Sequence, residues 1–347
     1  MSSSNTTTQK ALMLESKHGN FVVGSRNIPR PGPGQLLVKV FATGLNPVDW
    51  KIQKYGMFVT EFPAVLGSDL AGEVEAVGEG VTSFKKGDRV FAQGTFESDS
   101  ASFQQYTLTY AATTAMIPAR FSYEDVATIP VALTAAYVGF YNMKPFGLGL
   151  ARPTESKNQG MYAGKPIVVL GGSSSVGQFA IQLAKLSGFS PIVTTASLKH
   201  TEFLKYTGAT YVLDRNLATD ALKTEIKKIT NNHINIVYDA ISLPVTQQTG
   251  HDLLVPGGNL ITVLDLSITK NDNINHIKVT GILRLPENQE LLAELYTKLS
   301  QFLEQGAIKP NRFKVLTGGL GGIITGLKDM ENDQVSGVKL VARPWDV

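Results

Sequence analysis

The sequence predicts an α/β chain of two domains: a strand-rich, partly open barrel and a doubly wound parallel sheet. Three observations support this prediction. Short apolar runs between Gly/Pro turns fill residues 11–130, strands alternate with helical stretches over residues 165–305, and a glycine-rich turn joins a strand to a helix at residues 171–177. A length of 347 residues suits two hydrophobic cores better than one.

The composition excludes several classes of protein. The formal net charge is +3 without a long Lys/Arg block, so nothing indicates nucleic acid as a partner. The chain has no cysteine, which excludes disulfides, thiolate nucleophiles and cysteine-ligated zinc. The histidines lack the i, i+4 spacing of a metal site; they are His18, His200, His233, His251 and His276. We therefore expect no metal.

Neither the start of the chain nor the uncharged stretch at residues 126–143 predicts a membrane segment. Residues 1–10 are rich in Ser, Thr and Asn, so we expect a flexible tail and not a signal peptide. Residues 126–143 carry no charge, as a membrane span would require. Pro130, Tyr137 and Asn142 in this stretch favour a buried helix instead. We expect a soluble, cytoplasmic protein with no membrane partner.

The first domain is expected to contain residues 11–138 and to be completed by residues 310–347. Apolar and polar residues alternate at 72–78, as in a half-buried strand. The other strands predicted here are residues 36–40, 103–108 and 115–117, and one that follows a turn within residues 81–90. We also predict a helix at residues 121–141, and a turn at 318–322 with one helix and short strands in the C-terminal segment.

The second domain is expected to cover residues 139–309, beginning with a Gly/Pro-rich loop at 145–164. Its predicted strands are residues 167–170, 191–195, 211–213, 234–239, 258–264 and 276–283, and its clearest helices are 178–187 and 291–303. This alternation is typical of a doubly wound sheet. The strand at 276–283 is a candidate edge that carries Lys278, which acts against pairing between copies, so monomer and homodimer both stay open.

The glycine-rich turn predicts a dinucleotide site. A strand, a tight turn and a helix N-terminus point backbone N–H groups and a positive helix end at a phosphate. We expect Gly172 to permit the turn and Gly177 to let the helix pack closely, while Ser174 replaces the middle glycine of the usual fingerprint. A turn without a ligand is the alternative. The predicted contacts are Gly172, Ser173, Ser174, Ser175, Val176 and Gly177.

The next strand indicates NADP in place of NAD. An NAD site has a carboxylate about 20 residues past the glycines to hold the ribose 2′-OH. No Asp or Glu occurs between Ser190 and Thr201. Ser197 and Lys199 stand there instead, and Arg215 follows the next strand. These groups attract a 2′-phosphate, which a carboxylate would repel.

Several motifs occur in the order found in the medium-chain dehydrogenase/reductase superfamily, at residues 46–51, 67–74, 87–90, 133–137 and 335–341. They extend over nearly the whole chain. The sequence resembles the zinc-free quinone oxidoreductase and enoyl reductase branch, and the loop at 145–164 resembles that of fungal trans-acting enoyl reductases. The resemblance implies a GroES-like catalytic domain and a Rossmann nucleotide-binding domain.

The resemblance also implies a reaction without zinc. Ser68 stands where the zinc enzymes of this fold have a histidine, and residues 43–46 offer no thiolate. The hydride acceptor must then be activated already, as in a C=C conjugated to a carbonyl or in a quinone. Hydride addition to the β-carbon builds negative charge on the carbonyl oxygen, and a proton then reaches the α-carbon.

The resemblance places four residues around the nicotinamide and its ribose: Asn46, Asp49, Lys51 and Thr134. Lys51 and Thr134 are the candidate catalytic residues. Lys51 would hold the cofactor or donate to the enolate; a surface lysine in a loop is the alternative interpretation.

Tyr55 is a third catalytic candidate, as a proton donor, although an ungapped count puts the tyrosine of mitochondrial-type enoyl reductases opposite Met57. Further cofactor contacts are expected at the ends of strands. They are Ile241, Leu264, Gly337 and Lys339.

The favoured interpretation is an NADPH-dependent reductase that transfers a hydride to the C=C of an enoyl or enone substrate, free or carrier-bound. An NADPH:quinone oxidoreductase is the alternative, and a non-catalytic NADPH-binding interaction protein is the second. A carrier-bound substrate would need a basic entrance, to which Lys51, Lys54 and Lys144 could contribute.

Overall fold

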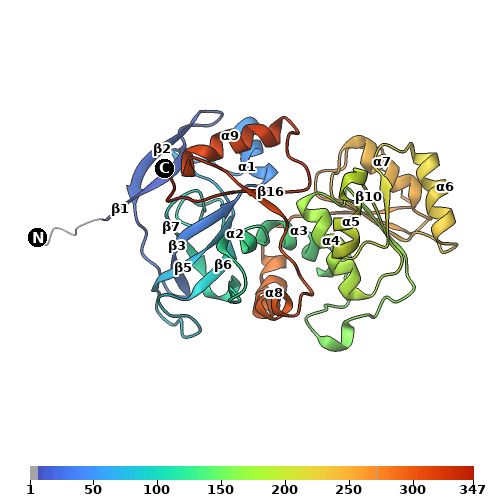
Figure 1. Cartoon of the computed structure of the whole chain (residues 1–347), viewed down its shortest axis with the longest axis horizontal. Helices are drawn as coiled ribbons and strands as arrows, with labels where there is room; N and C mark the ends of the chain where they lie inside the picture. The colour runs from blue at the N-terminus through green and yellow to red at the C-terminus, as the bar shows by residue number, and fades with distance from the viewer. Residues whose placement is uncertain (1–6, 271) are drawn as a thin grey trace, which may run out of the picture. The chain divides into compact units, whose positions relative to one another are not determined.

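The computed structural model describes residues 7–270 and 272–347, and the chain divides into two compact units (Figure 1). The first contains the chain up to Val131 together with residues 299–301 and 310–347. The second contains residues 132–298 and 302–309. The predicted flexible tail is wrong for its last residues, because strand β1 (Thr8–Leu14) pairs with β2 (Phe21–Asn27) from Thr8 onward. Residues 1–6 of that tail lie outside the described residues.

The first unit is built on a seven-stranded sheet in the order β15-β16-β3-β5-β6-β8, with β7 also paired to β3. A smaller sheet has the order β2-β1-β4. The strand bounds are β3 Gln35–Gly44, β4 Ala64–Val65, β5 Asp69–Val77, β6 Arg89–Gln93, β7 Tyr106–Tyr110, β8 Thr114–Met116, β15 Phe313–Val315 and β16 Lys339–Ala342. The C-terminal strand β16 pairs with β3, so residues far apart in sequence share one sheet.

Strand β3 pairs with β5, β7 and β16. Its apolar residues explain this central place in the sheet. Leu36, Val38 and Val40 alternate along it and are fully buried against Leu70 and Val74 of β5. Two register irregularities between β3 and β5 bend the pair, as bulges do in barrels. The predicted strand-rich, barrel-like first domain is confirmed.

The second unit contains one parallel sheet in the order β11-β10-β9-β12-β13-β14. Its strands are β9 Ile167–Leu170, β10 Ile192–Ala196, β11 Tyr211–Asp214, β12 Ile236–Asp239, β13 Asn259–Thr262 and β14 Asn275–Lys278. The strand order reverses between β9 and β12, which is the point where a doubly wound sheet binds its ligand, outside the carboxyl ends of the strands. The predicted doubly wound sheet is confirmed.

The helices are α1 Pro47–Tyr55, α2 Tyr123–Val126, α3 Pro130–Tyr141, α4 Ser175–Ser187, α5 Thr201–Thr207, α6 Thr219–Ile229, α7 Pro244–Leu253, α8 Pro286–Glu304 and α9 Gly319–Glu331. Short 3₁₀ turns are η1 Ala111–Thr113, η2 Ser156–Asn158 and η3 Leu198–His200. Helix α4 packs on β9 and β10, and α7 packs on β12 and β13.

Three predicted elements differ from the structure. The helix expected at 121–141 is interrupted after α2, because Pro130 suits only the first turn of a new helix. The turn expected at 318–322 is instead the start of α9, with Gly318 at φ +83° just before it. The last predicted strand ends at Lys278 and does not continue to 283.

The boundary between the units lies after Val131, not after residue 138 as expected. Residues of α3 pack within the second unit. The Tyr238 hydroxyl donates to the Ala135 carbonyl at 2.9 Å, and a Cβ at Gly139 would lie 2.9 Å from the Tyr238 ring. Within residues 7–270 and 272–347, no helix is long and apolar enough to cross a membrane.

Two glycines of the first unit provide a test of this packing. A Cβ at Gly72, in β5, would lie 1.9 Å from the Lys39 carbonyl of β3, whereas a Cβ at Gly321, in α9, meets nothing within 4 Å. We expect Gly72→Ala to lower the free energy of unfolding by about 2 kcal/mol or more. The control Gly321→Ala should raise it by up to about 1 kcal/mol, because alanine favours helix. Urea unfolding measures both, and equal effects would contradict the close β3–β5 approach.

Candidate functional site

The glycine-rich turn lies at the reversal point of the parallel sheet. Strand β9 ends at Leu170, and Gly171 adopts φ +75°, a conformation that favours glycine. Gly171 therefore makes the turn, and the prediction of this role for Gly172 is wrong. A Cβ at Gly171 would also lie 2.3 Å from Cγ1 of Ile241, so the Ile241 side chain lies directly over the turn. The sequence interpretation missed Gly171, although it precedes the expected glycine directly.

Gly172 and Gly177 are required by close approaches. A Cβ at Gly172 would lie 2.0 Å from Oγ1 of Thr194, on β10. A Cβ at Gly177 would lie 2.3 Å from the Gly171 carbonyl oxygen, so only glycine lets α4 approach the turn this closely. The packing role predicted for Gly177 is confirmed.

The serines of the turn form the N-terminus of α4. Ser174 is the N-cap, and its Oγ accepts from the Gly177 N–H at 3.0 Å. The Ser173 carbonyl accepts from Nε2 of Gln178 at 3.0 Å. The N–H groups of Ser175 and Val176 belong to the first turn of the helix, where such groups have no intrahelical partner. Together with the helix dipole they form a place for an anion.

The residues expected at the adenosine ribose lie at the ends of two neighbouring strands. Ala196 of β10 pairs with Asp214 of β11, and the Arg215 N–H donates to the Ala196 carbonyl at 3.0 Å. Ser197 is half-buried, whereas the side chains of Lys199 and Arg215 are exposed. Within the part of the chain that the structure describes, neither cation belongs to an ion pair.

The sequence did not single out one carboxylate that lies at this edge of the parallel sheet. Asp214 ends β11, and its Oδ1 accepts from the Asn216 N–H at 2.9 Å. It follows the third strand of the sheet rather than the second, so it is not the acid of the NAD fingerprint.

Thr134, in α3, carries the feature expected of a ligand contact. Its Oγ1 is buried and has no hydrogen-bond partner among the described residues. Buried hydroxyl groups in folded chains are nearly always bonded, so this atom is available to a ligand. In the second unit, the glycine turn, the α4 N-terminus and this hydroxyl fit a bound dinucleotide.

In the first unit, the predicted site residues Asn46 and Lys339 form a buried polar network with Asp69. The Lys339 Nζ lies 2.7 Å from Oδ2 of Asp69 and donates to Oδ1 of Asn46 at 2.6 Å. The Asn46 Nδ2 donates to Asp69 Oδ2 at 2.9 Å, and the Val131 N–H donates to Asp69 Oδ1 at 2.7 Å. Asp69 was not among the predicted site residues, although it lies in the motif at 67–74.

Asp49 lies beside this network and is fully buried. Its Oδ2 accepts from the Asn46 N–H at 2.7 Å, which closes the capping box of α1. Burial raises the pKa of Asp49 to about 7, and the nearby Asp69 charge adds to this effect. Asn46, Asp49 and Lys339 thus bind one another or Asp69, and their predicted contacts with the cofactor stay a prediction. Gly337, at φ +67°, accepts from Arg312 through its carbonyl.

The catalytic candidates of α1 differ in their surroundings. Lys51 is half-buried with its Nζ 5.5 Å from the centre of the Trp50 ring, and burial lowers its pKa. Tyr55 is 53% exposed at the end of the helix. Phe58 follows at φ +65° and stacks on Phe96 with ring centres 4.9 Å apart. The segment after Lys51 therefore presents apolar side chains to its surroundings.

Ser68 stands at the position where the resemblance places the histidine of the zinc enzymes. Ser68 is buried and its Oγ has no hydrogen-bond partner among the described residues. In residues 7–270 and 272–347, no group of three or more His, Cys, Asp or Glu side chains could hold a metal ion.

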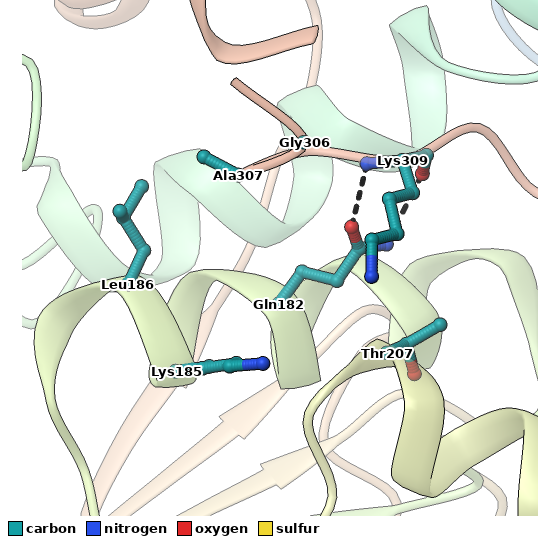
Figure 2. Close-up of a pocket in the computed structure, with 7 residues that line it drawn as sticks. All are labelled: Gln182, Lys185, Leu186, Thr207, Gly306, Ala307 and Lys309. Atoms are coloured by element: carbon teal, nitrogen blue, oxygen red, sulfur yellow. Dashed lines mark hydrogen bonds between the residues drawn. The ribbon is translucent and has the colours of Figure 1, made fainter. Parts of the chain in front are cut away.

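A cavity in the second unit is a separate feature. It has a volume of about 230 Å³ and is lined by residues of α4, α5 and the segment after α8: Gln182, Lys185, Leu186, Thr207, Gly306, Ala307 and Lys309. Figure 2 shows the two hydrogen bonds between the Gln182 amide and the Lys309 backbone that close one side. The cavity adjoins the C-terminal half of α4 and does not include the glycine turn.

The pKa of Asp49 predicts a pH dependence of stability. The folded chain holds the Asp49 proton up to a pKa of about 7, against the ordinary value of 3.8. Folded protein therefore binds more protons than unfolded protein between these values, and this group's contribution to the free energy of unfolding falls as pH rises through that window. Asp49→Asn should gain stability relative to the wild type between about pH 4 and pH 8. Urea unfolding measures this, and the exposed-loop control Glu79→Gln should show no such trend.

The comparisons with known proteins agree with this architecture. The alcohol dehydrogenase GroES-like domain matches residues 32–133, and the zinc-binding dehydrogenase domain matches residues 175–294. The chain is 35% identical over 272 residues to trans-enoyl reductase TOXD of Cochliobolus carbonum, covering 77% of this chain and 87% of that protein. It is 32% identical over 364 residues to trans-enoyl reductase gkaC of Penicillium citrinum, covering 96% and 98%.

The fold is shared with solved structures at lower identity. An alcohol dehydrogenase superfamily protein from Novosphingobium aromaticivorans superimposes with a TM-score of 0.79 at 23% identity, covering 96% of this chain and 99% of that one. The order of motifs, the GroES-like first unit and the doubly wound second unit thus confirm the expected family. The chain belongs to the medium-chain dehydrogenase/reductase superfamily of nicotinamide-dependent enzymes, in the branch that contains the trans-enoyl reductases it is similar to.

Proposed function

We propose that this chain is an NADPH-dependent reductase that transfers a hydride to the activated C=C of an α,β-unsaturated carbonyl substrate without zinc. The observation that carries the proposal is the glycine turn at the β9–β12 reversal point, in a chain similar over most of its length to trans-enoyl reductases. A bound nicotinamide dinucleotide supplies the hydride.

The second unit provides the groups that hold the dinucleotide. The N–H groups of Ser175 and Val176 receive the pyrophosphate, because the first turn of α4 leaves them without intrahelical partners. The unpaired hydroxyl of Thr134 donates to or accepts from the ligand. Ile241 and Leu264 contact it at the ends of β12 and β13.

The first unit provides the groups that stabilise the negative charge developed on the substrate. Negative charge builds on the carbonyl oxygen as hydride reaches the β-carbon, and a cationic donor stabilises that charge. Lys51 is the candidate, because it is a half-buried cation whose pKa is lowered by burial. Tyr55, exposed on the same helix, is the proposed source of the proton for the α-carbon.

The absence of zinc chemistry is proposed from the donor set of the chain. Ser68 replaces the histidine, and no cysteine occurs anywhere in the sequence. Lys339 compensates the charge of Asp69 in the buried network, so this part of the first unit needs no metal for charge balance.

NADPH oxidation with a panel of acceptors tests the reaction class. The panel holds an enoyl thioester, a free enone and a quinone, and we expect turnover of the thioester or enone with little quinone reduction. Lys51→Met and Thr134→Val should each lower kcat by about a hundredfold, in the range for loss of one donor or acid–base group. The control Lys86→Met removes an exposed lysine of the first unit that pairs with Glu75 and should leave kcat unchanged. Quinone turnover alone would transfer the assignment to a quinone oxidoreductase.

Cofactor preference tests the ribose edge. Each of Lys199→Ala and Arg215→Ala should raise the KM for NADPH by about tenfold and leave that for NADH unchanged, since one charge-assisted contact to the 2′-phosphate is lost. Lys205→Ala, an exposed lysine of α5 near Glu202, is the matched control. Equal use of NADH and NADPH by the wild type would refute the roles of Ser197, Lys199 and Arg215.

A further inference from the structure

Gln247 of α7 is fully buried and bonds two separate loops. Its Nε2 donates to the carbonyl of Ser242, after β12, and to the carbonyl of Asp265, after β13, each at 2.9 Å. Its Oε1 accepts from the N–H of Ser267 at 2.8 Å. Both donor positions of the amide are thus used, and one side chain ties together the ends of two adjacent strands.

The first of these loops contains a residue in an uncommon backbone conformation. Ser242 has φ +58°, which is uncommon for a residue with a side chain. Oδ1 of the buried Asp239 accepts from the N–H groups of Ile241 and Ser242 at 3.0 and 2.8 Å. The Ser242 Oγ accepts from the Val263 N–H at 2.8 Å, which adds a second bond between the loops. Such strain persists only where the surroundings over-determine it, and it clusters at functional sites.

The residues next to these anchor points are the two cofactor contacts expected at the ends of β12 and β13. Ile241 directly precedes Ser242, and its side chain lies over the glycine turn, because a Cβ at Gly171 would approach it to 2.3 Å. Leu264 directly precedes Asp265, and its carbonyl accepts from the Thr262 Oγ1 at 2.9 Å. Movement of either anchor carbonyl would therefore shift a residue that is expected to contact the cofactor.

We propose that Gln247 is a positioning residue that holds Ile241 and Leu264 against the dinucleotide, so that cofactor affinity depends on its side-chain amide. This inference rests on the proposed function of the same site. The chemistry requires an amide. A methionine of similar length would leave two carbonyls and one N–H unpaired, and a glutamate could not donate to both carbonyls.

The test compares Gln247→Met and Gln247→Glu with Gln248→Met. Gln248 is the next residue of α7, exposed, and donates to Oδ1 of Asp252 at 2.8 Å, so it controls for the loss of a glutamine from this helix. Calorimetric titration with NADPH should give a Kd raised by about tenfold in both Gln247 variants and by less than about twofold in the control. With saturating NADPH, kcat for the enoyl substrate should stay within about twofold of the wild type, since no reacting atom is touched.

Amide hydrogen exchange gives a readout that general destabilisation does not reproduce. Residues 263–267 should exchange faster in the Gln247 variants, while the strands β9 and β10 keep their protection. Wild-type NADPH affinity in folded Gln247 variants would overturn the inference and leave the proposed function standing.

Two further outcomes must be separated from failure of the inference. A wild-type protein that binds no nicotinamide dinucleotide would defeat the proposed function itself. If neither Gln247 variant folds, hydrogen exchange on the wild type tests the same link: bound NADPH should slow exchange of the Ser267 N–H, which donates to Gln247 Oε1, together with the N–H groups of Ile241 and Ser242. Unchanged exchange of the Ser267 N–H on NADPH binding would overturn the inference as well.

Discussion

The first unit depends on the ion pair between Asp69 and Lys339. Both side chains are almost completely buried, with Nζ and Oδ2 2.7 Å apart. Breaking a buried pair by removing one partner typically costs about 3–5 kcal/mol, because the other charge is left without compensation. Asp69 also accepts from Asn46 and from the N–H of Val131. One carboxylate therefore joins β5, β16, the N-terminus of α1 and the start of α3, and it makes the C-terminal strand part of a unit that begins at the other end of the chain.

A second buried aspartate has the same organising role in the second unit. Asp239 ends β12 and accepts the N–H groups of the strained turn at Ile241 and Ser242. Burial raises the pKa of its carboxyl group, and the bonds from Ser242, Thr246 and Ile241 act against that shift. Around it, the approaches of Gly171, Gly172 and Gly177 leave no room for side chains. The end of the sheet at the reversal point is thus shaped by backbone groups that side chains hold in place.

These two networks divide the candidate residues into two groups. Asn46, Asp49 and Lys339 hold the first unit together through one another and Asp69. The second group has polar atoms that remain available. No ion pair with the described residues involves the cations Lys51, Lys199 and Arg215, and the Thr134 hydroxyl has no hydrogen-bond partner among those residues. The second group carries the proposed chemistry.

The sequence by itself determined the elements whose causes are local. The glycine turn, the strand at 167–170 and the packing role of Gly177 follow from residue type and spacing, and so does the alternation that makes the second unit doubly wound. Residue spacing cannot show which buried charge finds which partner, because Lys339 and Asn46 are 293 positions apart. Nor can it show that Gly171 rather than Gly172 makes the turn, that Pro130 begins a new helix, or that Gln247 joins two loops. These features depend on contacts between distant segments, and only the tertiary structure decided them.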